Sequence, residues 1–177
     1  DLAVAFHRMG DLEMVERLHA EDLSEMRFRE KVTRAVQLRL EVIEDREAVR
    51  RGATLFALPQ NALAGAQAMW GTADAIWTAL GDTSDDLNWY TKRATLSGVL
   101  STTVLYWLGD DSMGQSDTRA FLDRRIEEVM QIETVKARVN AIPGMKALMA
   151  GPNWVASMIR RPQDLPKDIP GVWQGGM

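Results

Sequence analysis

Apolar residues recur every three or four positions along most of this chain, which is the spacing of one face of an α-helix. The pattern predicts helices over residues 2–18, 24–44, 46–58, 61–80, 87–108 and 116–138, and a short helix over 153–161. Pro59, Gly81 and Pro143-Gly144 interrupt the pattern, as residues that end helices do. No segment alternates with a period of two, so the sequence predicts an all-α fold.

The predicted helix 87–108 changes its chemistry along its length. Its start carries the two aromatic residues Trp89 and Tyr90 beside the two cations Lys92 and Arg93. Its end, residues 104–108, is apolar on every side, and such a helix has to be covered on every side. In a chain this short, we expect the cover to be a second copy of the protein or a bound apolar molecule.

Composition narrows the possible classes of function. The net charge of −4 argues against a surface that coats nucleic acid, and the absence of cysteine removes disulfides and thiolate chemistry. No apolar run reaches the roughly 20 residues that span a bilayer. We expect one helical domain over 1–161, followed by a Pro/Gly-rich tail over 162–177. Because Asp1 already lies inside a helical pattern, we also expect a further N-terminal part.

Catalytic chemistry finds little support in the sequence. Glu16 and His19 have the Glu-x-x-His spacing of di-iron bundles, but a second such motif is missing, so we interpret them as solvent-facing polar residues. The hydroxyl residues Ser97, Ser101, Thr102 and Thr103 have no histidine near them in sequence and are interpreted as small residues that allow close helix contact. We therefore predict no catalytic residue, no metal and no enzymatic activity.

The tryptophans are the candidates for a binding role. Trp70 and Trp77 share a helix face, either in an ordinary core or in the wall of an apolar pocket. Trp89 and Tyr90 follow a helix start, where aromatic residues beside arginine are typical of protein–protein contacts. The alternative is that Trp89 folds back on the preceding loop.

A short amphipathic helix is predicted near the end of the chain. Trp154, Val155, Met158 and Ile159 form its apolar face, and Arg160 with Arg161 lies at one end. Helices of this kind lie on membrane surfaces. The alternative is that the helix docks on the body of its own chain.

Several of these segments resemble one protein family. They are Ala73 to Trp77, Gly81-Asp82, the Asn-Trp-Tyr-Thr-Lys-Arg block within 86–94, Asp117-Thr118 and 121–126. Together they resemble the COQ-nine family of accessory proteins in ubiquinone biosynthesis, with the appearance of a bacterial member. The similarity extends from Asp1 to about Arg161.

The resemblance implies a TetR-regulator-like C-terminal helical domain that forms a homodimer. The two long helices, 87–108 and 117–138, would build a four-helix interface with their partners. Family members bind isoprenoid or other lipids in an apolar cavity and need no cofactor besides this ligand. The residues predicted to contact the lipid are Phe56, Met69, Trp70, Ala73, Trp77, Leu96 and Leu100.

The resemblance also implies partners. Trp89, Tyr90 and Arg93, with Asn88 and Lys92 beside them, would contact a di-iron quinone hydroxylase, to which the protein presents a quinone intermediate. The helix with Trp154, Val155, Met158, Ile159, Arg160 and Arg161 would contact the membrane. This implies a cytoplasmic protein peripheral to the bacterial inner membrane, without nucleic acid as a partner. The alternative is a TetR-type transcriptional regulator whose DNA-binding part precedes this chain.

Overall fold

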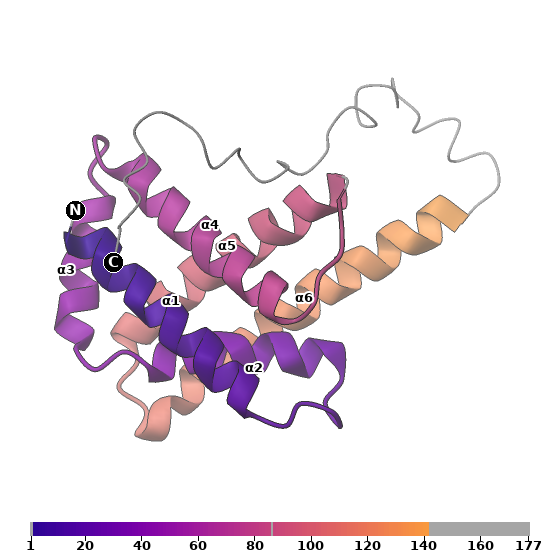
Figure 1. Ribbon diagram of the computed structural model, residues 1–177, viewed down its shortest axis with the longest axis horizontal. Helices are drawn as coiled ribbons and strands as arrows, with labels where there is room; N and C mark the ends of the chain where they lie inside the picture. The colour runs from indigo at the N-terminus through magenta and orange to yellow at the C-terminus, as the bar shows by residue number, and fades with distance from the viewer. Residues whose placement is uncertain (1, 86, 142–177) are drawn as a thin grey trace, which may run out of the picture.

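Six α-helices and one short 3₁₀ helix make up the described part of the chain (Figure 1). The computed structural model describes residues 2–85 and 87–141, with side chains described as far as Gln131. The elements are α1 (Leu2–Ala20), α2 (Phe28–Glu41), α3 (Arg46–Phe56), α4 (Ala62–Ala79), α5 (Leu87–Gly109), η1 (Met113–Gln115) and α6 (Ser116–Ala141). No strand occurs within these ranges, and the predicted all-α fold is confirmed.

The helix boundaries follow the sequence signals with one exception. α4 ends where Gly81 takes a φ of +79°, the left-handed conformation that glycine adopts without steric cost. The predicted start of the second helix at Ser24 is wrong. α2 begins at Phe28, and the carboxylate of Glu30 accepts the backbone N–H of Arg27 at 2.8 Å. The Asp22 carboxylate binds the Ser24 N–H at 3.0 Å within the preceding turn.

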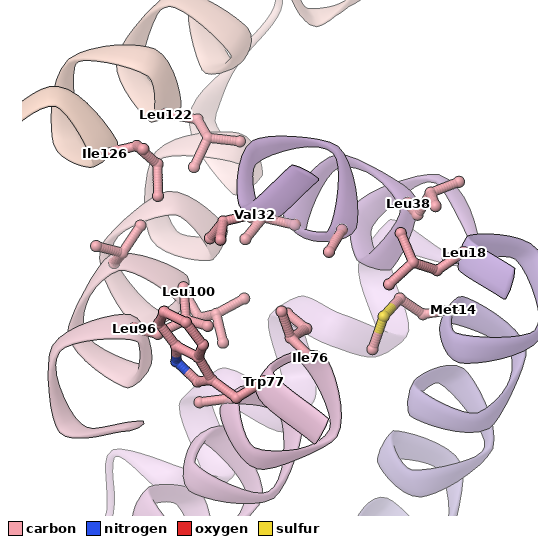
Figure 2. Packing of buried hydrophobic residues seen from close by; sticks show 14 residues of the cluster. Met14, Leu18, Val32, Leu38, Ile76, Trp77, Leu96, Leu100, Leu122 and Ile126 are labelled. Carbon is pink, nitrogen blue, oxygen red and sulfur yellow. The ribbon is translucent and has the colours of Figure 1, made fainter. Parts of the chain in front are cut away.

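The core lies where α1, α2, α4, α5 and α6 meet (Figure 2). It consists of Met14, Leu18, Val32, Ala35, Val36, Leu38, Ala73, Ile76, Trp77, Leu96, Val99, Leu100, Leu122 and Ile126. These residues come from one stripe on each helix, so the 3.6-residue period of the sequence leads directly to this packing. α6 contributes through its first half and then extends away from the body (Figure 1).

The first half of α1 has apolar residues at helical spacing and is nevertheless exposed. Leu2, Phe6 and Met9 follow this spacing, but their side chains are 86%, 49% and 67% exposed. Only the second half of α1, with Met14 and Leu18, reaches the core. The apolar spacing therefore identifies the helix, but it does not show that the first half of the helix is buried.

α3 is held at its two ends and also in its middle, where Val49 and Ala53 pack against the cluster of Leu40, Trp107 and Leu108. At its start, the guanidinium groups of Arg46 and Arg50 donate to the last backbone carbonyls of α5, including Asp110 at 2.7 Å and Leu108 at 2.8 Å. These carbonyls have no partner within their own helix, so the arginines cap α5. At the other end, Phe56 lies so close to Gly65 that a Cβ there would be 2.7 Å from the Phe56 Cβ. No residue of α3 is buried.

The end of α5 is covered on one side. Trp107 and Leu108 are buried against Leu40 of α2, whereas Leu105 and Tyr106 are 63% and 39% exposed. The Tyr106 ring stacks on Phe121 of α6 with a centroid distance of 4.4 Å. α5 and α6 are the two longest helices, as expected for a TetR-like arrangement, which is consistent with the family. Their four-helix interface stays a prediction.

Two predicted features lie outside the described residues. They are the short helix 153–161, with its membrane-contacting residues, and the boundary to the tail at 162. In the part of the chain that is described, none of the helices has the length and apolar character needed to cross a bilayer.

Candidate ligand cavity and aromatic patch

A cavity of about 340 Å³ lies between α1, α2, α3, α4 and α5. Its volume falls within the usual range of small-molecule sites, roughly 300–1,000 Å³. Most of its wall is apolar, with residues from all five helices. The apolar lining includes Phe6, Met9, Val36, Leu40, Val42, Ile43, Val49, Ala53, Phe56, Met69, Leu100 and Val104.

The cavity exists because α3 spans the gap with small side chains. Ala48, Gly52 and Ala53 face it from the middle of α3, where larger residues would fill the space. The contacts described above hold α3 at both ends, so its middle cannot simply move inward. Atoms that line a cavity have no neighbours on one side and so lose dispersion contacts. A ligand of suitable shape can restore these contacts.

Three of the seven residues predicted to contact a lipid line this cavity. They are Phe56, Met69 and Leu100. Ala73, Trp77 and Leu96 do not line it, because they are packed into the solid core with exposures of 0%, 7% and 3%. Trp77 is further held by stacking on Phe28 at 5.5 Å and by donating its indole N–H to the Lys92 carbonyl at 3.2 Å.

Trp70, the seventh residue, lies in a different place. Its ring centroid is 5.9 Å from that of Trp89 and 6.3 Å from that of Tyr90. The predicted pocket role of Trp70 is therefore corrected to a place in an aromatic cluster with the start of α5. The spacing of Trp70 and Trp77 on one helix face did not reveal that Trp70 packs beside Trp89 and Tyr90, whereas Trp77 packs in the core.

A polar network forms one wall of the cavity, through His7, Arg39 and Thr72. The Arg39 Nε donates to Asp11 Oδ1 at 2.7 Å, and the Thr72 hydroxyl donates to the same oxygen at 2.8 Å. The His7 Nε2 lies 2.8 Å from the Thr72 Oγ1. The guanidinium of Arg39 rests on Gly10, where an added Cβ would meet its Cζ at 3.0 Å.

His7 is neutral in this network. Burial lowers its pKa, and although Asp11 opposes this effect, the charge of Arg39 reinforces it. The geometry agrees, since the Arg39 Nη2 lies 3.3 Å from His7 Nδ1, which must then be the accepting nitrogen. The Nε2 carries the proton and donates a hydrogen bond to the Thr72 hydroxyl oxygen.

Sequence reasoning missed this network, although the chain contained two signals. His7 and Asp11 are four positions apart and so share a helix face. Arg39 stands between Leu38 and Leu40 in a helix whose apolar stripe it continues, and it is only 8% exposed. A cation at a core position requires a buried anion, and a search for that anion would have led to Asp11.

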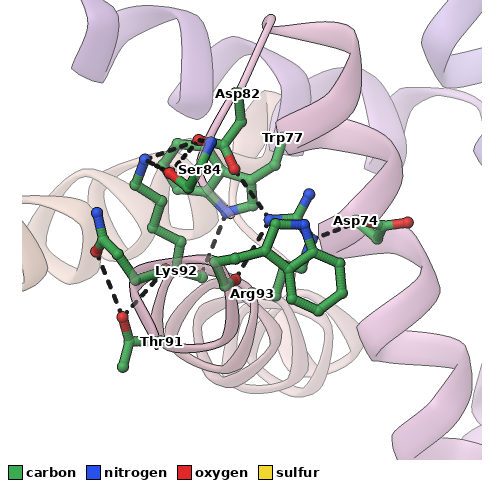
Figure 3. Close-up of polar contacts among 9 residues, drawn as sticks. Asp74, Trp77, Asp82, Ser84, Thr91, Lys92 and Arg93 are labelled. Carbon is green, nitrogen blue, oxygen red and sulfur yellow. Dashed lines mark hydrogen bonds and ion pairs between the residues drawn. The ribbon is translucent and has the colours of Figure 1, made fainter. Parts of the chain in front are cut away.

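The start of α5 carries a second site, an aromatic patch formed by Trp70, Trp89 and Tyr90. Arg93 lies beneath it, with its Cζ 4.0 Å from the Trp89 ring centroid. Its Nε contacts Asp74 at 2.5 Å and its Nη1 contacts Asp82 at 3.0 Å (Figure 3). Because both carboxylates bind the guanidinium, Arg93 fixes the loop before α5 to α4 and supports Trp89 from below.

Asp82 is the centre of this polar cluster. Burial pushes its pKa upward, but hydrogen bonds from Lys92, Ser84 and Arg93 outweigh burial and hold the pKa well below its usual range. The Lys92 Nζ lies 2.7 Å from the Asp82 Oδ1 (Figure 3). Asp82 is therefore an anion at physiological pH and forms ion pairs with Lys92 and Arg93 of α5.

The residues predicted to meet a partner protein thus divide into two groups. Asn88 is exposed, and Trp89, Tyr90 and Lys92 are partly exposed, so a partner can reach them. Arg93 is only 2% exposed, and its predicted direct contact is corrected to a positioning role. On α5, Thr103 of the cavity lies 14 residues after Trp89, about 20 Å along the helix, whereas on α4 Met69 of the cavity directly precedes Trp70 of the patch.

Other residues considered for chemistry occupy ordinary places. Glu16 and His19 are exposed, and among the side chains described, residues 2–85 and 87–131, no three His, Asp or Glu are grouped to hold a metal ion. Three hydroxyl groups of α5 donate to carbonyls one turn earlier: Ser97 at 2.7 Å, Ser101 at 2.8 Å and Thr102 at 2.9 Å. The hydroxyl of Thr103, in contrast, is buried without a hydrogen-bond partner.

Fold and site together define an all-α protein with a ligand-sized apolar cavity and a separate aromatic patch. The family model named COQ9 matches residues 62–133. COQ9 is the COQ-nine family named above. This segment contains α4, α5 and most of α6, and hence the whole patch and one wall of the cavity. The chain carries a COQ9-family domain, and the resemblance seen in the sequence is confirmed.

Similar proteins carry the same family name. The chain is 39% identical over 82 residues to "Ubiquinone biosynthesis protein COQ9, mitochondrial" of Rattus norvegicus, covering 46% of this chain and 26% of that protein. It is 34% identical over 119 residues to the probable coq9 protein of Dictyostelium discoideum, covering 64% of this chain and 37% of that one. The chain thus spans well under half the length of these relatives. Both are eukaryotic, and a bacterial origin for this chain stays a prediction.

Proposed function

We propose that this chain is a non-enzymatic lipid-binding protein that assists ubiquinone biosynthesis. It holds a polyprenyl quinone intermediate, or a related lipid, and presents it to a di-iron quinone hydroxylase. The observation that carries this proposal is the apolar cavity of about 340 Å³ beneath α3. The names of the related proteins support the pathway.

The physical argument concerns the solubility of the ligand. Transfer of an isoprenoid chain from a membrane into water exposes apolar surface at a large cost in free energy. A protein cavity that takes over part of that surface lowers this cost. Exposed apolar side chains near the cavity, such as Phe6 and Met9, extend the apolar path outward from its wall.

The aromatic patch is the proposed contact for the hydroxylase. Trp and Tyr side chains dominate the free energy of many protein contacts because they bury a large area at little cost in entropy. Here Arg93, Asp74 and Asp82 hold the patch in one conformation before a partner arrives. A contact surface that is already ordered loses less entropy on binding.

The exposed apolar end of α5 suits a homodimer. Leu105 lies on the surface beside the stacked pair Tyr106 and Phe121. A second copy that covers this face would build the four-helix interface expected from the resemblance. The amphipathic segment with Trp154 and Ile159 is the proposed contact with a membrane surface, which makes the protein peripheral to that membrane.

Mass spectrometry of lipids that copurify with the protein tests the lipid claim. We expect an isoprenoid or phospholipid to be retained by the wild type and lost from Ala53→Phe, which places a ring in the cavity. Ala66→Phe, on the exposed side of α4, is the matched control and should retain the lipid. Wild-type protein that stays empty after gentle purification in the presence of membrane lipids would refute the claim.

A pull-down with a quinone hydroxylase tests the patch separately. The variant Trp89→Ala/Tyr90→Ala should recover much less hydroxylase than the wild type, while its lipid content is unchanged. Because neither Trp89 nor Tyr90 lines the cavity, the two substitutions should leave lipid binding unchanged. Equal recovery of the hydroxylase would remove the patch assignment and leave the lipid claim intact.

A further inference from the structure

The hydroxyl group of Thr103 differs from its neighbours on α5. Ser97, Ser101 and Thr102 each donate to a backbone carbonyl one turn earlier. Thr103 lines the cavity, is 1% exposed, and its Oγ1 has no hydrogen-bond partner. A buried hydroxyl without a partner costs free energy, so a ligand atom that pairs with it gains more than at an exposed site.

The cations in the cavity wall are already neutralised. Arg39 is bound by the Asp11 carboxylate at 2.7 Å, and His7 accepts a hydrogen bond from Arg39 in its neutral form. Glu13 and Glu44 are the other charged residues in the described lining, and both are acidic. An anionic head group would therefore meet no free positive charge in this cavity, and it would lose its hydration on entry.

Exposure distinguishes the two ends of the site. The two hydroxyl residues Thr103 and Thr72 are each 1% exposed, whereas Phe6 and Met9 in the α1 part of the lining are 49% and 67% exposed. The hydroxyl groups are thus deep, and the apolar side chains of α1 lie toward the solvent. This order suits a ligand that enters with its polar group first and leaves its apolar chain along α1.

We propose that the cavity selects an uncharged amphiphile and that the Thr103 hydroxyl forms a hydrogen bond to the polar group of that ligand. This inference rests on the proposed lipid-binding function and adds the class of head group and its position. Phenols, alcohols and quinones fit this description. Fatty acids, whose head groups are anionic, do not.

Three isoprenoids of one chain length test the inference: farnesol, which is neutral and hydrogen-bonding; farnesoic acid, which is anionic; and farnesene, a hydrocarbon. Wild-type protein should bind farnesol more tightly than either of the others. Thr103→Val removes the hydroxyl at nearly constant shape and should weaken farnesol binding about three- to tenfold, the value of one hydrogen bond. The affinity for farnesene should not change.

Two variants act as controls. Thr103→Ser retains a hydroxyl and should restore farnesol binding, which excludes a mere packing defect in Thr103→Val. Thr102→Val removes an exposed hydroxyl that is already bound to the Gly98 carbonyl, and it should leave all three affinities unchanged. A thermal melt of each variant verifies folding.

The possible failures are distinguishable. Equal farnesol binding by wild type and Thr103→Val would show that Thr103 is satisfied within its own helix and would overturn the inference. Tighter binding of farnesoic acid would overturn the selection of uncharged ligands. Both results would leave lipid binding in place, whereas no binding of any of the three by the wild type would contradict the proposed function itself.

Discussion

Two stretches of the same buried stripe on α2 and α5 pack against very different surroundings. Along the first stretch, Val32 and Leu96, with Ile76 of α4 and Leu122 of α6, fill a core in which every one of them is at most 3% exposed. Further along the same stripe, from Val36 and Leu100 onward, the two helices border a cavity of about 340 Å³ beneath α3. Helix propensity does not distinguish the regions, because both are built from regular helices. The difference lies in what each neighbouring helix contributes.

The core is filled because α1, α4 and α6 direct large apolar residues toward it. α3 directs Ala48, Gly52 and Ala53 toward the cavity, and it is held at its ends by arginine caps and by the contact of Phe56 with Gly65. A helix that is held in place and carries small side chains keeps a space open. Stability and ligand binding thereby depend on neighbouring stretches of the same helix faces.

The largest expected effect is the loss of stability when a side chain is truncated in the core rather than in the cavity wall. Ile76→Ala in the core should lower the free energy of unfolding by about 2–5 kcal/mol, because it leaves a new void among residues that cannot move inward. Val49→Ala in the cavity wall should cost less than about 1 kcal/mol, because its side chain is only partly removed from water. Urea denaturation measures both, and equal costs would contradict the contrast.

The second effect concerns the support of α3. The double variant Arg46→Ala/Arg50→Ala leaves the last carbonyls of α5 without their guanidinium donors and should destabilise the fold by about 1–3 kcal/mol. Hydrogen exchange should accelerate in α3 more than in α4. Arg51→Ala is the matched control, because Arg51 is 79% exposed and pairs only with Glu47. Uniform acceleration in both helices would refute the end-fixed arrangement.

A pH titration tests the buried network beside the cavity. The pKa of His7 is lowered in the folded state, so the unfolded chain binds a proton more readily. Stability is therefore fully present above the unfolded histidine pKa of about 6.5 and decreases as the pH falls below it. The variant His7→Gln should lose this part of the pH dependence. An unchanged profile would show that His7 is not held neutral.

The smallest expected effect comes from added volume. Ala53→Phe should change the free energy of unfolding by less than about 1 kcal/mol, because the ring enters existing space. Ala35→Phe puts the same ring into the solid core, where Ala35 is 0% exposed, and should cost about 1–3 kcal/mol or more. Similar costs at the two positions would mean that the cavity is closed in solution.

The sequence predicted the helices well because their signal is local. Residues three and four positions apart identify a helix, and Gly81 or Pro59 marks its end without reference to the rest of the fold. The chemical change along α5 was also correct, since Trp89 and Leu108 do lie in different surroundings. The predicted start of the second helix at residue 24 was wrong because Asp22 binds the Ser24 N–H within a turn, whereas Glu30 accepts the Arg27 N–H at the start of α2.

The site was harder to predict because it depends on which helices meet. Phe56, Met69 and Leu100 line the cavity, and their contact with a lipid stays a prediction, whereas Trp70 lies on the patch. Arg93 was expected at a partner surface, and Asp74 and Asp82 draw it inward. The network of His7, Asp11, Arg39 and Thr72 joins three helices that are far apart in sequence, and no local pattern records that meeting.

Ligand-dependent thermal unfolding tests the central claim most directly, namely that an apolar ligand enters the space beneath α3. Farnesol at a hundredfold excess over its dissociation constant should stabilise wild-type protein by about 2.7 kcal/mol. Ala53→Phe should show the same unfolding temperature without ligand and no increase with it. An equal increase in both proteins would place the ligand elsewhere and contradict this account.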